Sequence, residues 1–196
     1  WENASTITTE NEPGMVADVP DSQPYSVIVN VGSPPYFVGS IITSGDAAHG
    51  MVADSDGSQA WNHGTVITGG TNSYGMVASG DNSTINNNSG NGTDRASVQT
   101  SGAGSHGMVA SGTGSSAHVN ISDVVTTGND AFGMYALNGA GVFNHLGGSI
   151  LTSGTDSHGM VAEGVGSTAT NEPGAVIRTT SADSYGMYAL DGGQAT

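Results

Sequence analysis

The chain is acidic and rich in glycine: its 196 residues include 32 Gly, 17 Asp or Glu and only two basic side chains, for a formal net charge of −15 at pH 7. This charge repels nucleic acids and anionic membranes, so we expect neither as a partner, whereas cations and neutral sugars meet no such barrier. The absence of cysteine excludes disulfides and thiolate metal sites. No apolar run reaches the roughly 18 residues of a membrane-spanning helix, so no direct membrane insertion is expected.

The first predicted elements are short strands near the N-terminus. WENASTIT at 1–8 has the form of an Asn-bearing strand followed by a β-branched one, and Gly-Met-Val-Ala follows at 14–17. Every later methionine also follows a glycine, at positions 51, 76, 108, 134, 160 and 187. The steps between methionines are 36, 25, 32, 26, 26 and 27 residues, so a unit of about 26 residues repeats, which predicts a solenoid.

Each unit contains three short segments bounded by turn-forming residues. One ends in Asn, as in AWN at 60–62; one is β-branched and ends in Thr, as in VIT at 66–68; one follows glycine, as in MVA at 76–78. Such segments, separated by Gly, Ser, Asn and Asp, are typical of strands. Three strands per unit predict an all-β fold: a single-stranded parallel β-helix (β-solenoid) of about seven rungs, in one domain spanning 1–196.

Equivalent residues of successive rungs should stack in columns. The inward core ladder is predicted to be Met15, Met51, Met76, Met108, Met134, Met160 and Met187. The alanine two residues after a repeat methionine should also point inward, and the Val or Tyr between them should face outward. In the β-branched segment, positions such as Val66 and Thr68 are predicted inward, and the mixed column between them, which holds Gln99 and Arg178, outward.

Two further columns carry polar or aromatic side chains. The residues before the repeat glycines are His49, Tyr74, His106, Phe132, His158 and Tyr185. A stacked planar column at a turn is favoured there over a metal or proton site, because aromatic residues interrupt the histidines. A second column, predicted to be a turn ladder of amides, comprises Asn62, Asn86, Asn120, Asn144 and Asn171.

Two units are enlarged, by insertions at about 20–40 and 81–96. The first holds four of the six prolines together with Tyr25, Tyr36 and Phe37, and the second holds Arg95. Loops on a rigid scaffold commonly carry binding function, so these four side chains are the candidate partner- or ligand-binding residues. A tolerated insertion or a laterally packed strand is the alternative.

The sequence contains no recognisable catalytic arrangement. Ser, His and Asp occur without a GxSxG elbow, and two arginines without any lysine do not make the basic face that cleavage of acidic sugars needs. We therefore predict no catalytic and no cofactor-binding residues. Four aspartates precede Met segments: Asp46, Asp130, Asp156 and Asp183. We favour solvated turn aspartates at these positions, and calcium bound between rungs is the alternative.

The recurring pattern YGMYA…GG…N…G.I.T.G resembles the passenger repeats of bacterial autotransporter adhesins. The resemblance covers essentially the whole chain and implies a right-handed β-helix, secreted to the bacterial cell surface, that acts in adhesion, aggregation or biofilm matrix. Its partners would be glycans or proteins of host or bacterial surfaces. We accordingly expect a non-catalytic structural or adhesive protein, with a polysaccharide-active enzyme as the least favoured alternative.

The two ends of the chain raise a further alternative. The chain stops at GMYALDGGQAT, and joining GGQAT to the initial WEN gives a sequence that resembles GSQAWN at 57–62. Copies stacked head to tail through open solenoid ends would then build an extracellular filament, unless the native chain continues on both sides.

Overall fold

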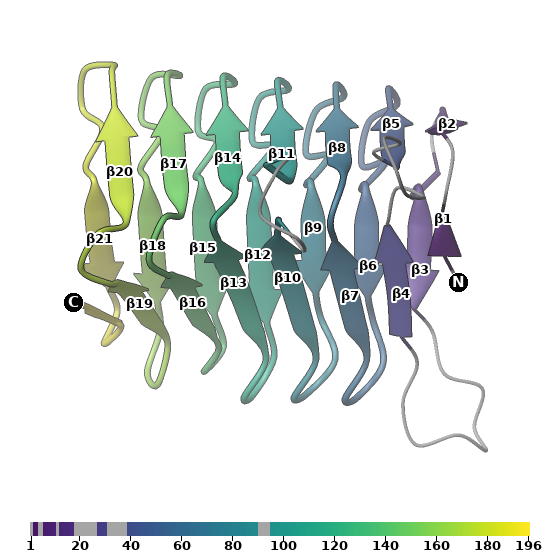
Figure 1. Cartoon of the computed structure of the whole chain (residues 1–196). Helices are drawn as coiled ribbons and strands as arrows, with labels where there is room; N and C mark the ends of the chain where they lie inside the picture. The colour runs from purple at the N-terminus through teal and green to yellow at the C-terminus, as the bar shows by residue number, and fades with distance from the viewer. Residues whose placement is uncertain (1, 4–5, 11, 18–26, 31–38, 90–94) are drawn as a thin grey trace.

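The computed structural model describes residues 2–3, 6–10, 12–17, 27–30, 39–89 and 95–196, and these residues form 22 short strands and no helix. Successive strands enter three parallel sheets in rotation. The chain therefore winds as a parallel β-helix with three strands per rung and about seven rungs (Figure 1), which confirms the predicted fold class.

We name the sheets A, B and C in the order in which the chain reaches them. Sheet A contains β1 (Glu2–Asn3), β4 (Val27–Asn30), β7 (Gln59–Asn62), β10 (Thr84–Asn88), β13 (Ser116–Asn120), β16 (Gly141–Asn144), β19 (Thr168–Asn171) and β22 (Gln194–Ala195). Sheet B contains β2 (Thr6–Thr9), β5 (Ser40–Thr43), β8 (Thr65–Thr68), β11 (Ser97–Thr100), β14 (Asp123–Thr126), β17 (Ser149–Thr152) and β20 (Val176–Thr179). Sheet C contains β3 (Met15–Ala17), β6 (Met51–Ala53), β9 (Met76–Ala78), β12 (Met108–Ser111), β15 (Met134–Leu137), β18 (Met160–Glu163) and β21 (Met187–Leu190).

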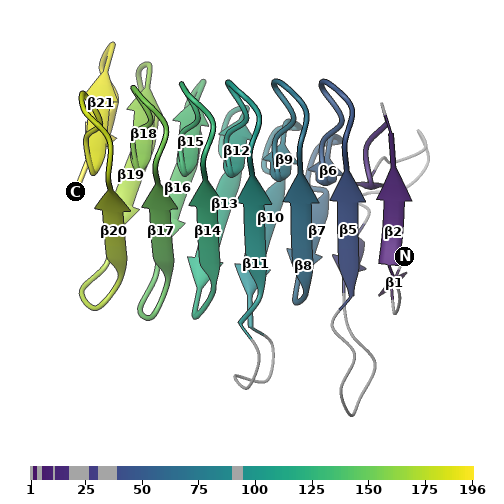
Figure 2. The same cartoon turned by 90° about the horizontal axis from the view of Figure 1, so that it is seen from above.

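Strands pair with their counterparts one rung away, without a shift of register in sheets B and C. Met108, for example, lies opposite Met76 on one side and Met134 on the other. Viewed from above, the strands of sheet B from β2 to β20 lie side by side along the length of the solenoid (Figure 2). This alignment turns each repeat position into a continuous column, as the periodicity predicts.

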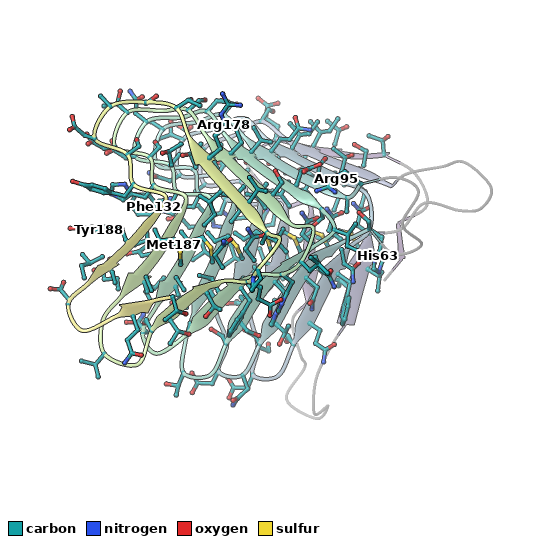
Figure 3. The ribbon with its side chains drawn as sticks, turned by 60° about the vertical axis from the view of Figure 1, so that its left-hand side comes forward. His63, Arg95, Phe132, Arg178, Met187 and Tyr188 are labelled. Atoms are coloured by element: carbon teal, nitrogen blue, oxygen red, sulfur yellow. The ribbon has the colours of Figure 1, made fainter. Side chains whose placement is uncertain are left out.

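The interior consists of the columns expected from the sequence. The methionines at 51, 76, 108, 134 and 160 are 0% exposed, and Met187 points into the solenoid in Figure 3. The column of Ile41, Val66, Val98, Val124 and Ile150 is equally buried. Methionine suits this narrow core because its unbranched, flexible side chain can pack on copies of itself.

In every rung except the last, the glycine before the methionine is required by close packing against the Ile/Val column. A Cβ on Gly75 would lie 2.1 Å from a methyl carbon of Val98 and 2.6 Å from the carbonyl oxygen of Gly107. The same overlap, at 2.2–2.3 Å from the methyl of the inward Ile or Val, occurs at Gly14, Gly50, Gly107, Gly133 and Gly159. The Gly-Met pair is therefore one steric unit: the glycine admits the β-branched side chain, and the methionine fills the space beside it.

The inward threonines close the corner between sheets B and C. In five rungs the threonine Oγ1 donates a hydrogen bond of 2.6–2.9 Å to the carbonyl oxygen five residues later. The donors are Thr43, Thr68, Thr100, Thr126 and Thr152, all at most 3% exposed. A buried carbonyl at the turn would otherwise lack a partner, which explains why this column holds threonine without exception.

The residue after each methionine lies outside the core cluster, as its predicted outward direction requires, but in most rungs it is not exposed to solvent. Val52, Val77, Val109 and Val161 are only 1–8% exposed, although they stand outside the main core cluster. Tyr135, which occupies the same column, contacts the rings of His106 and Phe132 outside sheet C. The side chains thus do point outward, but the aromatic column folds over them and forms a second apolar layer.

The amide ladder is present, but two of its predicted members are wrong. Residues 30, 62, 87, 144 and 171 share the column, whereas Asn86 lies opposite Trp61 and Asn120 lies opposite Asn88. The column position beside Asn144 is occupied by Val119. The register differs because β10 and β13 extend one residue further than the other strands of sheet A.

Within this column each amide donates to the next. Asn30 Nδ2 donates to Asn62 Oδ1, and Asn62 Nδ2 donates to Asn87 Oδ1, both at 2.8 Å. Val119 interrupts the chain, so the buried Asn144 Oδ1 has no hydrogen-bond partner.

The enlarged unit at 20–40 contributes to the same sheet through β4, which lies between β1 and β7.

The ladder predicts different costs for the same substitution at two of its positions. Asn62→Ala should lower the free energy of unfolding by at least about 1 kcal/mol more than Asn144→Ala, because it leaves buried donors and acceptors on both neighbouring rungs without partners. Asn144 has an unpartnered oxygen already and donates to Asn171, which is not fully buried. Urea denaturation of both variants measures the difference, and equal losses would contradict the ladder.

Candidate functional site

The outer face of sheet A carries a group of ring and amide side chains outside the core. One outward column runs Trp61, Asn86, His118, Phe143 and Thr170. Beside it, at the C-terminal ends of the strands, lie His63, His145 and Glu172. His63 lies on the opposite side of the solenoid from Phe132 and Tyr188 in Figure 3. This face is therefore separate from the aromatic column over sheet C.

Three side chains on this face form a hydrogen-bonded chain across successive rungs. Glu172 Oε1 lies 2.8 Å from Nδ1 of His145, and Nε2 of His145 lies 2.8 Å from Nδ1 of His118. The two imidazole planes differ by only 3°, as an in-plane hydrogen bond requires. We call this set the imidazole chain.

The Glu172 carboxylate determines which ring nitrogens of the imidazole chain donate hydrogen bonds and which accept them. Glu172 can only accept when ionised, so His145 donates from Nδ1 and, when neutral, accepts at Nε2. His118 then donates from Nδ1, which leaves its Nε2 as a lone-pair acceptor with no partner among the described residues. Burial, reinforced by the nearby His145, lowers the pKa of His118 to about 4, so this imidazole is neutral at physiological pH.

A hollow of about 300 Å³ opens beside His118 and Phe143. The hydroxyl-bearing Ser116 and Thr168 line it, and its floor is mainly glycine, with Gly114, Gly139, Gly141 and Gly166 among the lining residues. The turn glycines Gly114, Gly139 and Gly166 border the hollow without side chains. At Gly141 the Phe143 ring and Thr168 Oγ1 occupy the space, 2.8 and 3.2 Å from where a Cβ would stand. The imidazole chain thus ends at the edge of an open, shallow hollow on the outer face of sheet A.

The column predicted to stack at the turn before each Gly-Met pair is present. Neighbouring ring centroids from His49 to Tyr185 lie 4.6–5.2 Å apart, with near-parallel planes in the first four pairs. Each histidine also accepts at Nδ1 the backbone N–H of the aromatic residue in the next rung, at 2.9–3.1 Å. These histidines, His49, His106 and His158, are therefore structural acceptors, and burial lowers the pKa of each.

The aromatic column predicts a loss of stability in mild acid. Burial lowers the pKa of His106 from 6.5 to about 4, so its contribution is fully present above pH 6.5 and is lost as the pH falls toward 4. At about 1.4 kcal/mol per pKa unit, the loss from this residue is about 3 kcal/mol. His106→Phe keeps a stacking ring but cannot titrate, so its stability should fall less over this interval.

Chemical denaturation at several pH values measures the two slopes. The carboxylates titrate in both proteins, so the comparison isolates the histidine. Identical pH dependence of the wild type and the variant would show that His106 is not held neutral by folding.

Arg95, a predicted ligand-binding residue, is engaged within the solenoid. Its guanidinium binds both carboxylate oxygens of Asp123 at 2.8 and 2.9 Å and donates to the carbonyl oxygens of Ser122 and Gly147. These bonds fasten the turn at Ile121, a β-branched residue with a φ of 48°. Left-handed backbone is unfavourable for such a residue, and the equivalent turn positions in the next two rungs are Gly147 and Gly174.

Relief of this turn should stabilise the protein. Ile121 is 46% exposed, so Ile121→Asn sacrifices little burial and places a residue that tolerates left-handed backbone, which should raise the free energy of unfolding by about 1 kcal/mol. The control is Ile42→Asn, in the regular strand β5, which should lower it. Thermal melts compare the two, and a destabilised Ile121→Asn variant would contradict the assignment of strain.

The turn aspartates have a conformational explanation. Asp130, Asp156 and Asp183 share a column of positive φ with Asn72 and Gly104, and Asp and Asn are tolerated in that conformation. Asp46 does not belong to this column, because Ala47 occupies the left-handed position in its rung. Across the described ranges, no group of three or more His, Cys, Asp and Glu side chains is arranged to hold a metal ion. Calcium between rungs, the less favoured alternative at these aspartates, stays untested.

The remaining candidates, Tyr25, Tyr36 and Phe37, lie outside the described residues.

Sequence reasoning missed the imidazole chain, although one signal was available. His145 and Glu172 each directly follow an asparagine of the amide ladder, so a full alignment of that position places them one rung apart. The link to His118 required the structure, because it crosses between two columns.

Comparison with known proteins identifies no relative. The chain matches no protein family, no curated protein and no solved structure. Within the part of the chain that the structure describes, no helix is long and apolar enough to cross a membrane.

Proposed function

We propose that the chain is a rigid structural and adhesive segment of an extracellular β-solenoid displayed on a bacterial surface. The observation that supports this most strongly is the use of its polar and aromatic side chains in ladders. Asparagines bond to asparagines, threonines close corners, and histidines accept backbone N–H groups of the next rung. Side chains committed to neighbouring rungs stiffen a rod and are not available for chemistry.

The surface charge is compatible with display in an aqueous environment. A net charge of −15 opposes association of parallel rods through their sides. About seven rungs of roughly 4.8 Å give this segment a length of about 34 Å. A non-catalytic scaffold of this kind positions binding side chains away from a surface, and Tyr25, Tyr36 and Phe37 remain the predicted contacts.

The weakness of the enzyme alternative lies in the scarcity of basic groups. Binding and cleaving an acidic polysaccharide needs cationic side chains on an exposed face. Arg95 is bound to Asp123, and Arg178 projects from the outer face of sheet B (Figure 3). Arg95 precedes β11 and Arg178 lies in β20, and β14 and β17 stand between those strands. The two arginines therefore do not form a common basic surface.

Adhesion can be measured on beads coated with the purified chain. The beads should be retained under flow on bacterial or epithelial cells, and the triple variant Tyr25→Ser, Tyr36→Ser and Phe37→Ser should lose most of that retention. The control variant replaces two exposed apolar turn residues, Leu146 and Val165, with serine. Circular dichroism should be the same for all three proteins.

Beads that do not adhere to any cell type would overturn the adhesive role. Electron microscopy of the same preparation examines the filament alternative: single short rods agree with the proposed display segment, whereas fibres that lengthen with protein concentration would favour a self-assembling subunit.

A further inference from the structure

We propose that the hollow beside His118 is a binding site for one neutral hexose unit of a surface glycan. The proposal deepens the adhesive function and rests on it for the source of the glycan. The site itself is inferred from its lining: two hydroxyls, an imidazole acceptor and an aromatic edge around a floor of glycine.

Residues from three successive strands of sheet A line the hollow. Ser116, Gly141 and Thr168 are opposite one another on three successive strands, β13, β16 and β19. Their strands are spaced by about 4.8 Å, so the two hydroxyl-bearing residues stand roughly 10 Å apart on either side of Gly141. Thr168 Oγ1 has no partner among the described residues, and Ser116 Oγ has a weak contact of 3.3 Å with Thr84. Both hydroxyls are thus available to substituents on opposite sides of a bound ring.

The imidazole chain adds a directional acceptor. Glu172 and His145 fix the donor at Nδ1 of His118, so Nε2, on the far side of the ring from His145, offers a lone pair. A ligand hydroxyl is a suitable donor to it. Because two rungs of hydrogen bonds orient this nitrogen, it is a pre-organised contact rather than a mobile surface histidine.

The aromatic wall supplies the apolar part of the site. Phe143 stacks on His118 with centroids 5.0 Å apart and planes 10° apart, and its ring edge leans over Gly141. The CH groups of a sugar ring can pack against this edge and the glycine floor. A volume of about 300 Å³ is at the lower end of small-molecule sites, which favours a single sugar unit over a longer bound segment.

Charge selects a neutral ligand. The lining contains no Asp, Glu, Lys or Arg among the described residues, so it offers neither a carboxylate for a cation nor a basic group for an anion. The net charge of −15 further repels acidic sugars. Hydroxyl groups on a compact ring are the chemistry that the lining fits.

Binding is tested by ¹⁵N-NMR titration of the full chain with the methyl glycosides of glucose, galactose, mannose and N-acetylglucosamine. At least one should give saturable shifts at Ser116, His118, Gly141 and Thr168. Gly141→Ala, whose added methyl would lie 2.8 Å from Phe143 and 3.2 Å from Thr168 Oγ1, should weaken this binding at least tenfold. The matched control is Gly69→Ala, where a Cβ meets nothing closer than 3.7 Å.

His118→Phe gives a second variant that keeps the ring stack and removes the acceptor, and it too should bind at least tenfold more weakly while its melting temperature shows that it folds. Three results would overturn the site: no saturable shift with any glycoside, unchanged binding in both hollow variants, or equally tight binding of glucuronate. Adhesion is measured separately on beads. Adhesive beads without sugar binding would overturn this site and leave the proposed function intact. Sugar binding without adhesion would overturn the adhesive function and leave this site intact.

Discussion

Close contact between the backbone of one glycine column and the β-branched side chains of the next rung determines the rest of this structure. Because a methyl group of Ile or Val occupies the place where each glycine would carry its Cβ, sheets B and C can approach closely at that corner. The remaining interior is narrow, and a column of flexible methionines with small alanines fills it. Interiors are packed to high density, so a change at any of these columns is transmitted to its neighbours.

Much of the fold could be predicted from the sequence, since each inward column has its own residue type. The recurring threonine, the glycine before each methionine and a column of Ile or Val determine the rung length and the register of sheets B and C. Sheet A was harder, because Asn86, Asn87 and Asn88 offer three registers and Val119 replaces an amide. Strand alternation predicts the outward direction of the Val109 side chain and its equivalents. Their burial could not be predicted in this way, because it depends on the aromatic residues that pack over sheet C.

The candidate site shows the opposite limit of sequence reasoning. Its parts are ordinary when considered singly: a histidine in a strand, another after an asparagine, and a glycine in a column that elsewhere holds Val, Gln, Thr or Ser. They become a site because the register places them around one hollow. In a repeat protein, chemistry is expected where a column departs from its own pattern, and Gly141 marks such a departure.

The histidine column has a consequence for how the solenoid can vary in length. Histidines accept backbone N–H groups from the aromatic residues of the next rung, so the column is built of pairs: His49 with Tyr74, His106 with Phe132, and His158 with Tyr185. Removal of a histidine rung would place two aromatics next to each other and leave the N–H of one without its acceptor. Removal of an aromatic rung would place two histidines next to each other. Addition or removal of two consecutive rungs keeps this alternation, so the histidine column repeats every two rungs although the chain folds in units of one rung.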